Sequence, residues 1–293
     1  MTNRLELNWK LDGLVDEQRY YCSETPIDLE NLPVPKAIIA GDARTYTDTA
    51  IEVGKKYYVA VGSVKGDIEK VSQELEIFAA NDEYWDNVVA LLHFDDDLTD
   101  ETGRTWQKIG DSSFGSGVFG SGLLLTRPNS NSNGLYSNGI VLDSDFTIEC
   151  FVNSSHTADE QCIVSCYKGF GSTGYTWEVL LEKTNGKLRF FHHSGTSGSY
   201  ILGSSNKVAD GVVHHIAVTR DGSVMRLFVD GNLHDSRVEF REYTAEAPLC
   251  IGYQHGGSGR FPLKGMIDEF RITSGVARYT ANFTPPDSPF LNY

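Results

Sequence analysis

The chain has 293 residues, of which 40% are hydrophobic and 11% aromatic, enough to build buried cores and too many for a disordered chain. Its 40 acidic and 25 basic residues give a net charge of −15, which argues against nucleic-acid binding and against charge attraction to an anionic membrane. No apolar run approaches the roughly 20 residues of a membrane-spanning helix, so no membrane insertion is expected. The polar, alternating start MTNRLELNWKLDG predicts no signal peptide.

The five cysteines are scattered and odd in number, which favours reduced thiols and synthesis in a cytosol over a disulfide framework. Cys162 and Cys166 are near each other in sequence. No second pair of cysteines or histidines stands at ligand spacing, so a zinc site is not expected.

Apolar residues alternate with period two along the whole chain, and no segment keeps a helical period for a dozen residues. This pattern predicts an all-β protein. In the first part, short strands separated by turn residues are expected at residues 4–10, 17–26, 36–39, 55–67 and 69–78.

The order of LELNW, a strand that ends at Pro26, and GKKYYVAVGSVKG resembles a fibronectin type III domain of the kind attached to phage tail proteins. The resemblance covers residues 1–78. It implies that Trp9 is a core tryptophan and that Tyr57 belongs to a central strand. Little chain precedes LELNW to supply a full first strand, so one sheet edge is expected to be open or filled by another chain, which favours assembly.

Residues 79–87 carry no alternation and are interpreted as a linker to a second domain at 88–293. Asn185-Gly186, Asp221-Gly222 and Asp230-Gly231 are strong hairpin signals there. Many strands joined by hairpins predict an antiparallel two-sheet sandwich of jelly-roll type. The expected strands are 88–94, 122–126, 145–152, 162–167, 175–183, 187–193, 200–204, 212–220, 224–230, 232–240, 249–253 and 265–272.

Four motifs in this second domain follow one another in the order typical of the laminin-G-like, concanavalin A-like lectin fold: DFTIECFV, VVHHIAVTRDGSVMRLFVDG, CIGYQHGGSG and KGMIDEFRIT. The closing SGVARYTANFTPPDSPF is similar to the ending of such domains in phage tail fibre and other virion proteins. The Pro-rich strap is expected to wrap the sandwich edge. Tyr279, Phe283 and Phe290 would anchor it by burying apolar area, on the order of 2 kcal/mol each.

No enzyme is expected. Glycoside hydrolysis needs two carboxylates roughly 5–10 Å apart, and the E-x-D-x-x-E strand of lectin-fold glucanases is absent. Glu178 and Glu182 share a face but lie about 13 Å apart on a strand. His214 and His215 point to opposite faces of their strand and cannot chelate one ion together, and the same holds for His192 and His193.

HFDDDLTDETG is an acidic loop after a strand, and loop carboxylates are suitable calcium ligands. In lectin-fold domains, a structural calcium is often held between an early acidic residue and the aspartate of the IDEF strand. The resemblance therefore implies Asp95 and Asp268 as ligands of a structural calcium. A solvated acidic loop with a capping aspartate explains the same residues.

Sugar binding uses aromatic rings that stack on pyranose faces, with amide and hydroxyl groups converging on the ring. Three Gly/Ser-rich loops, GSTGYTW, FHHSGTSGSY and GYQHGGSGRF, supply such groups. Ordinary packing explains any one of these residues as well. The glycan-binding candidates are Tyr175, Trp177, His193, Tyr200, Tyr253, His255 and Arg260.

The resemblance implies a virion component of a tailed phage, made in the bacterial cytoplasm, that sits in a tail fibre, tail tip or other appendage. Its lectin-like domain would contact bacterial surface glycan, and its partners would be other virion proteins, on a virion scaffold or in an oligomer. A purely structural virion or capsid decoration protein without a ligand is the alternative, and a glycan depolymerase is the third hypothesis.

Overall fold

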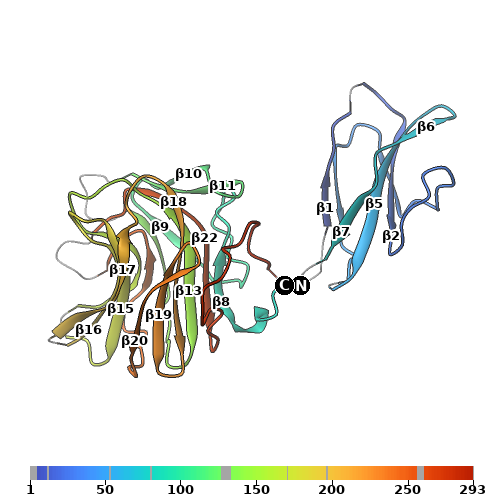
Figure 1. Cartoon of the computed structure of the whole chain (residues 1–293). Helices are drawn as coiled ribbons and strands as arrows, with labels where there is room; N and C mark the ends of the chain where they lie inside the picture. Colours follow the sequence, from blue (N-terminus) through green and yellow to red (C-terminus); the bar gives the residue numbers. More distant parts are fainter. Residues whose placement is uncertain are drawn as a thin grey trace. The chain divides into compact units, whose positions relative to one another are not determined.

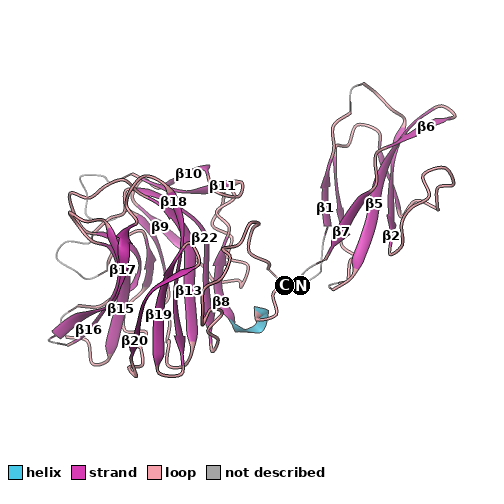
Figure 2. Cartoon of the chain, in the orientation of Figure 1, coloured by secondary structure: helices cyan, strands magenta, loops and turns pink. Residues whose placement is uncertain are grey.

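The computed structural model describes residues 5–11, 13–52, 54–79, 81–126, 133–169, 171–195, 197–255 and 261–292. Strands make up nearly all of its regular structure, so the predicted all-β class is confirmed (Figure 2). The chain divides into two compact units, with the boundary between Glu83 and Tyr84. No helix in these ranges is long and apolar enough to cross a membrane.

The first unit is a small sandwich whose two sheets differ in size (Figure 1). Strands β1 (Leu5–Asn8) and β4 (Thr45–Asp48) form a two-stranded sheet. The second sheet has the order β3-β2-β5-β6, and β7 also pairs with β5. Its strands are β2 (Glu17–Ser23), β3 (Ala37–Ala40), β5 (Lys56–Lys65), β6 (Ile68–Val71) and β7 (Leu75–Phe78).

Tyr20, Tyr57 and Val59 form the centre of the first unit's core. Tyr20 comes from β2, and Tyr57 and Val59 follow from the alternation of β5, whose odd-numbered residues in this part face the two-stranded sheet. Trp9, expected in this core, is only half buried and follows the end of β1. Because β1 ends at Asn8, the indole lies beside the core cluster rather than within it.

The second unit is a larger sandwich that begins with the short helical turn η1 (Trp85–Asn87). One sheet has eight strands in the order β10-β11-β22-β13-β18-β19-β20, with β8 paired to β22. Figure 1 shows β22, β13, β18, β19 and β20 running side by side. The bounds are β8 (Val88–Leu92), β10 (Ser113–Ser116), β11 (Ser121–Leu125), β13 (Phe146–Asn153), β18 (Val213–Asp221), β19 (Val224–Val229), β20 (Asn232–Val238) and β22 (Gly265–Ser274).

The opposing sheet has seven strands in the order β17-β16-β15-β14-β21-β12-β9. The core lies between the two sheets and includes Trp177, Phe190, Phe146 and Phe270, all fully buried. The bounds are β9 (Gln107–Ile109), β12 (Gly134–Ser137), β14 (Gln161–Cys166), β15 (Tyr175–Leu181), β16 (Lys187–Ser194), β17 (Ser197–Lys207) and β21 (Leu249–Ile251).

The closing strap covers the outer face of the eight-stranded sheet, not its edge as the sequence suggested. Tyr279 and Phe283 stack with ring centroids 3.6 Å apart, and both contact Phe228 of β19 and His215 of β18. Phe290 packs on β13 and β22 further along the same face. These four strands are neighbours in the middle of the sheet, so the strap crosses the face itself.

A buried charge network lies under the strap and fixes it. Glu149 accepts hydrogen bonds from Arg271 Nε at 2.9 Å and from the Tyr279 hydroxyl at 2.8 Å. Burial alone would raise the pKa of Glu149, but the Arg271 guanidinium and then His215 outweigh burial and hold the pKa at about 2. The carboxylate therefore stays charged and paired, and the strap covers the outer face of this sheet over β13, β18, β19 and β22.

Candidate functional site

The outer face of the seven-stranded sheet is the second large face of this unit. Residues directly opposite each other in antiparallel strands share a face, so the backbone register defines which side chains lie together. One row crosses the sheet on its outer face and is called the outer row below. It consists of Gln107, Tyr136, Cys250, Ser165, Glu178, Phe191 and the backbone of Tyr200.

Aromatic side chains gather at one end of the outer row. The ring of Tyr167 lies 6.3 Å from Phe191 and 5.6 Å from His193, measured between centroids. Tyr167 and Phe191 are partly exposed, whereas His193 is buried. Partly exposed rings held by neighbours are the kind of rigid apolar surface on which a sugar ring stacks.

Glu178 occupies the middle of the outer row and is almost fully buried. Gln254 Nε2 donates a hydrogen bond of 2.8 Å to its carboxyl group. Burial raises the pKa of Glu178 to about 8, and the hydrogen bond from Gln254 opposes that rise only in part. The group is therefore largely protonated at neutral pH. The outer row contains one carboxylate, whereas glycoside hydrolysis uses two.

A polar groove lies at the other end of the outer row. Two adjoining hollows of about 490 and 570 Å³ share Thr105, Ser137 and Asn138, and together they are called the edge groove below. Tyr136 donates a 2.6 Å hydrogen bond to Gln107, and both residues line the groove. A tyrosine ring beside amide and hydroxyl groups is a composition suited to a saccharide.

Glu246 links the edge groove to the loop that follows Tyr167. It lines the groove and accepts hydrogen bonds from the Thr173 backbone N–H at 2.9 Å, from the Gly174 N–H and from Lys168 Nζ at 3.0 Å. The Thr173 N–H is the largest of the influences that lower the pKa of Glu246 to about 2. The carboxylate is therefore charged at neutral pH and holds the loop in place.

The structure separates the glycan-binding candidates. His193 lies on the outer face, and the Tyr253 carbonyl accepts a hydrogen bond from Ser165 of the outer row. Trp177 has no exposed surface and stacks on Phe190 in the core, so it is not available to a ligand. Tyr175 packs against the core side, 5.0 Å from His192.

His255 is exposed at the end of the described part of its loop. The Tyr200 side chain and Arg260 lie outside the described residues. The predicted opposite orientation of neighbouring histidines is confirmed: His192 faces Tyr243 in the core, whereas His193 faces Tyr167.

Several residues of this face were not among the candidates, namely Gln107, Tyr136, Tyr167 and Phe191. Tyr136 and Gln107 lie on strands of three or four residues, which are too short to be recognised from the alternation of apolar and polar residues. Phe191 could have been found, because in a strand one residue of the pair Phe190-Phe191 must face outward.

Asp95 and Asp268 meet at one loop. The Val118 and Phe119 N–H groups donate to Asp268 Oδ2 at 2.7 and 3.0 Å, and the Ser121 N–H donates to Asp95 Oδ1 at 2.9 Å. Burial raises the pKa of Asp268 to about 6 against these hydrogen bonds. Calcium takes six to eight oxygen ligands, and within the described ranges no three His, Cys, Asp or Glu side chains group as metal ligands. Two carboxylates alone supply fewer oxygen atoms than calcium takes, and backbone carbonyls or water would have to complete the site. Calcium binding here stays a prediction.

The two-sheet sandwich with a polar, aromatic outer face defines a lectin-type β-sandwich protein. The chain belongs to the concanavalin A-like lectin/glucanases superfamily, whose laminin-G-type family model matches residues 129–278. No curated protein matches the chain.

Two solved structures are similar in fold. Domain 4 of AbnA, a GH43 extracellular arabinanase from Geobacillus stearothermophilus in complex with arabinotriose, is 19% identical, with a TM-score of 0.53 over 64% of this chain and 93% of that chain. The binding domain of Paraclostridial Mosquitocidal Protein 1 is 17% identical, with a TM-score of 0.53 over 67% of this chain and 51% of that chain. At these identities the likeness concerns the fold.

Proposed function

We propose that the outer face of the seven-stranded sheet binds glycan without cleaving it. The observation that carries this proposal is the contrast between the two outer faces of the second unit. The strap covers one face over a buried charge network. The other face is buried at Cys250, Ser165 and Glu178 in its middle, but it carries partly exposed aromatic rings at one end and the edge groove at the other. The arabinotriose complex of the AbnA domain supports it, because that protein holds a sugar on a similar sandwich.

The wider role that we propose is that of a virion protein of a tailed phage, in a tail fibre, tail tip or other appendage. Its second unit would contact bacterial surface glycan, and its first unit, a fibronectin type III-like module, would join it to other virion proteins. The order of the sequence motifs and the Pro-rich ending support this proposal.

A non-catalytic role rests on the chemistry of the outer row. A hydrolase needs one carboxyl group as acid and a second as base or nucleophile. Glu178 is the single carboxylate of the row, and it is buried at 2% exposure. Glycan cleavage is measured directly by the reducing ends that are released when a polysaccharide is incubated with the protein. No release above that of a blank is expected.

The test is binding of the fluorescently labelled protein to a panel of bacterial strains and to their extracted surface polysaccharides. Saturable, strain-selective binding is expected. The variants Tyr136→Ala and Tyr167→Ala should each weaken it about tenfold, which corresponds to about 1.4 kcal/mol. Phe240→Ala is the matched control, because Phe240 is 76% exposed and follows β20 of the opposite sheet.

The control variant should bind like the wild type. If the folded protein binds no strain and no polysaccharide, the glycan proposal is wrong and a structural virion role without ligand replaces it. If all three aromatic variants weaken binding equally, the outer face is not the site.

A further inference from the structure

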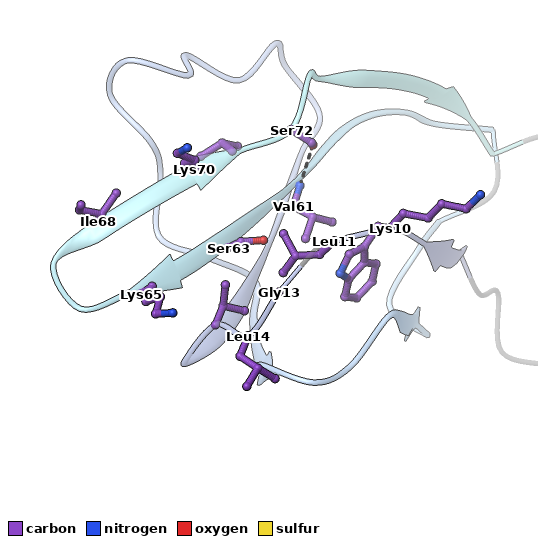
Figure 3. Close-up of a pocket in the computed structure, with 13 residues that line it drawn as sticks. Lys10, Leu11, Gly13, Leu14, Val61, Ser63, Lys65, Ile68, Lys70 and Ser72 are labelled. Carbon is purple, nitrogen blue, oxygen red and sulfur yellow. Dashed lines mark hydrogen bonds between the residues drawn. The ribbon is translucent and has the colours of Figure 1, made fainter.

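The first unit carries a groove that the glycan proposal does not use. It has a volume of about 610 Å³ and lies between the segment after β1 and the strands β5 and β6. We call it the lysine groove. It is lined by Trp9, Lys10, Leu11, Gly13, Leu14, Val15, Val61, Ser63, Lys65, Ile68, Lys70, Val71 and Ser72 (Figure 3).

The groove exists because the two sheets of the first unit differ in length. Strand β5 has 10 residues, whereas the opposing strands β1 and β4 have four residues each. Tyr57 and Val59 of β5 lie under the short sheet and enter the core. Val61, Ser63 and Lys65 continue on the same face beyond that cover, since alternate residues of a strand share a face.

The walls of the groove are apolar and unusually exposed. Leu14 is 78% exposed and Ile68 is 67% exposed. Figure 3 shows Leu11 beside Val61, and Ile68 further along on β6. Clustered exposed apolar side chains commonly mark a surface that a partner covers.

The charge of the lining is opposite to that of the chain. Among the described residues, three lysines and no carboxylate line the groove, although the chain has 40 acidic and 25 basic residues. Other lysines of this unit are ion-paired: Lys36 with Asp48, Lys55 with Glu24 and Glu52, and Lys56 with Glu76.

Lys10, Lys65 and Lys70 form no ion pair within the described residues. Lys10 extends at one end of the groove, and Lys65 and Lys70 lie at the other end (Figure 3). Anions placed along the groove would meet ammonium groups at both ends.

Two backbone and side-chain features indicate what kind of anion fits. Strand β6 ends its sheet, so one of its sides has no partner strand among the described residues. The Trp9 indole N–H is buried and, within the same part of the chain, donates to no acceptor. An extended peptide supplies carbonyl acceptors for both, together with apolar side chains for the walls.

We propose that the lysine groove binds an extended acidic segment of a partner protein, in which carboxylates alternate with apolar residues. The apolar side chains contact Leu14, Val61 and Ile68, and the carboxylates pair with Lys10, Lys65 and Lys70. This site is independent of the proposed glycan site on the seven-stranded sheet, because it lies in the other unit of the chain.

The probe is a fluorescein-labelled peptide, GEVEVEVEG, titrated with the whole chain and followed by fluorescence anisotropy. The peptide with Gln in place of every Glu is its control. The double variant Lys65→Gln/Lys70→Gln should weaken binding about tenfold or more. The matched double variant Lys55→Gln/Lys56→Gln removes the same charge from the same unit, outside the groove, and should change binding less than about twofold.

A second readout locates the peptide. The four tryptophan indole N–H signals are recorded by NMR, and Trp9→Phe assigns the signal of Trp9. The peptide should shift that signal and leave the other three unchanged.

Equal weakening by both double variants would mean attraction by general charge and would overturn the proposal. Binding of the Gln peptide as tight as that of the Glu peptide, an unshifted Trp9 signal, or no binding at about 1 mM protein would also overturn it.

Discussion

Two buried glutamates in the second unit show how neighbours decide the state of one residue type. Glu149 lies against Arg271 and His215, which hold its pKa at about 2 although burial opposes them. Glu178 has a neutral amide as its hydrogen-bond donor, and burial raises its pKa to about 8. The first carboxylate anchors the strap as an ion, and the second sits in the outer row as a largely neutral acid.

The raised pKa of Glu178 predicts a pH-dependent stability. Between the ordinary pKa of 4.5 and about 8, the folded protein keeps a proton that the unfolded chain releases. The free energy of unfolding should therefore fall as pH rises through this window, by at most about 4 kcal/mol from this group. Urea unfolding at pH 5 and pH 8 should show a larger loss for the wild type than for Glu178→Gln.

The conservative variant Glu178→Asp is the control, because it keeps a carboxyl group at this position. Equal pH dependence of the wild type and Glu178→Gln would contradict the assignment of the raised pKa.

Residue by residue, alternation correctly predicted which neighbours point to opposite faces, but not which of the two faces is the core. His192 and His193 illustrate the first point. Tyr175 and Trp177 illustrate the second, because their Gly/Ser-rich surroundings resemble a surface loop while their strand turns them inward. The cross-strand partner decides this, and one strand's sequence does not contain that partner.

Among the elements, the sequence correctly predicted which aromatic residues anchor the strap, but not which surface they pack against. Tyr279, Phe283 and Phe290 do anchor it, on the face of the sheet rather than its edge. The deciding contact is the hydrogen bond from Tyr279 to Glu149, a residue 130 positions away in the chain. A local pattern carries no information about a partner at that distance.

Removing this hydrogen bond should destabilise the second unit. Tyr279→Phe keeps the ring and should lower the free energy of unfolding by about 1–3 kcal/mol, because the acceptor is a buried carboxylate. Tyr279→Ala also loses the stacked ring and should cost about 3 kcal/mol or more. Denaturant unfolding measures both, and a Tyr279→Phe variant as stable as the wild type would contradict the contact.

The loop held by Glu246 connects the two ends of the outer face of the seven-stranded sheet. Glu246→Ala removes the acceptor of the Thr173 and Gly174 N–H groups and of Lys168. Amide hydrogen exchange in residues 171–174 should become at least about tenfold faster, since local opening loses these bonds. Lys168→Ala, which removes only an exposed ion pair, should change exchange little. Unchanged exchange in Glu246→Ala would show that Glu246 does not hold this loop in place.

For the molecule as a whole, the all-β class and the lectin-type sandwich could be predicted because alternation and hairpin turns recur along the chain. Strand β4 of the first unit and strands β9, β10 and β12 of the second unit were missed, since three or four residues are too few for a period to show. Two of these strands, β9 and β12, carry part of the edge groove. The site was therefore less predictable than the fold that supports it.

Calcium binding would be seen in the melting temperature of the protein, because it would stabilise the second unit. The prediction from Asp95 and Asp268 is a higher melting temperature with calcium than with a chelator. Asp268→Asn should abolish that difference. An identical melting temperature with calcium and with chelator would leave the two aspartates as hydrogen-bond acceptors of the loop at 118–121.

NMR chemical shifts can map where the glycan binds on the protein, using an oligosaccharide from a polysaccharide that the protein binds. Binding at the outer face of the seven-stranded sheet should shift signals in β12, β14, β15 and β16 and around Tyr167, and leave the strap at 275–290 unchanged. Shifts confined to the strap and the eight-stranded sheet would contradict the proposed binding face, because the ligand would then occupy the face that the strap covers.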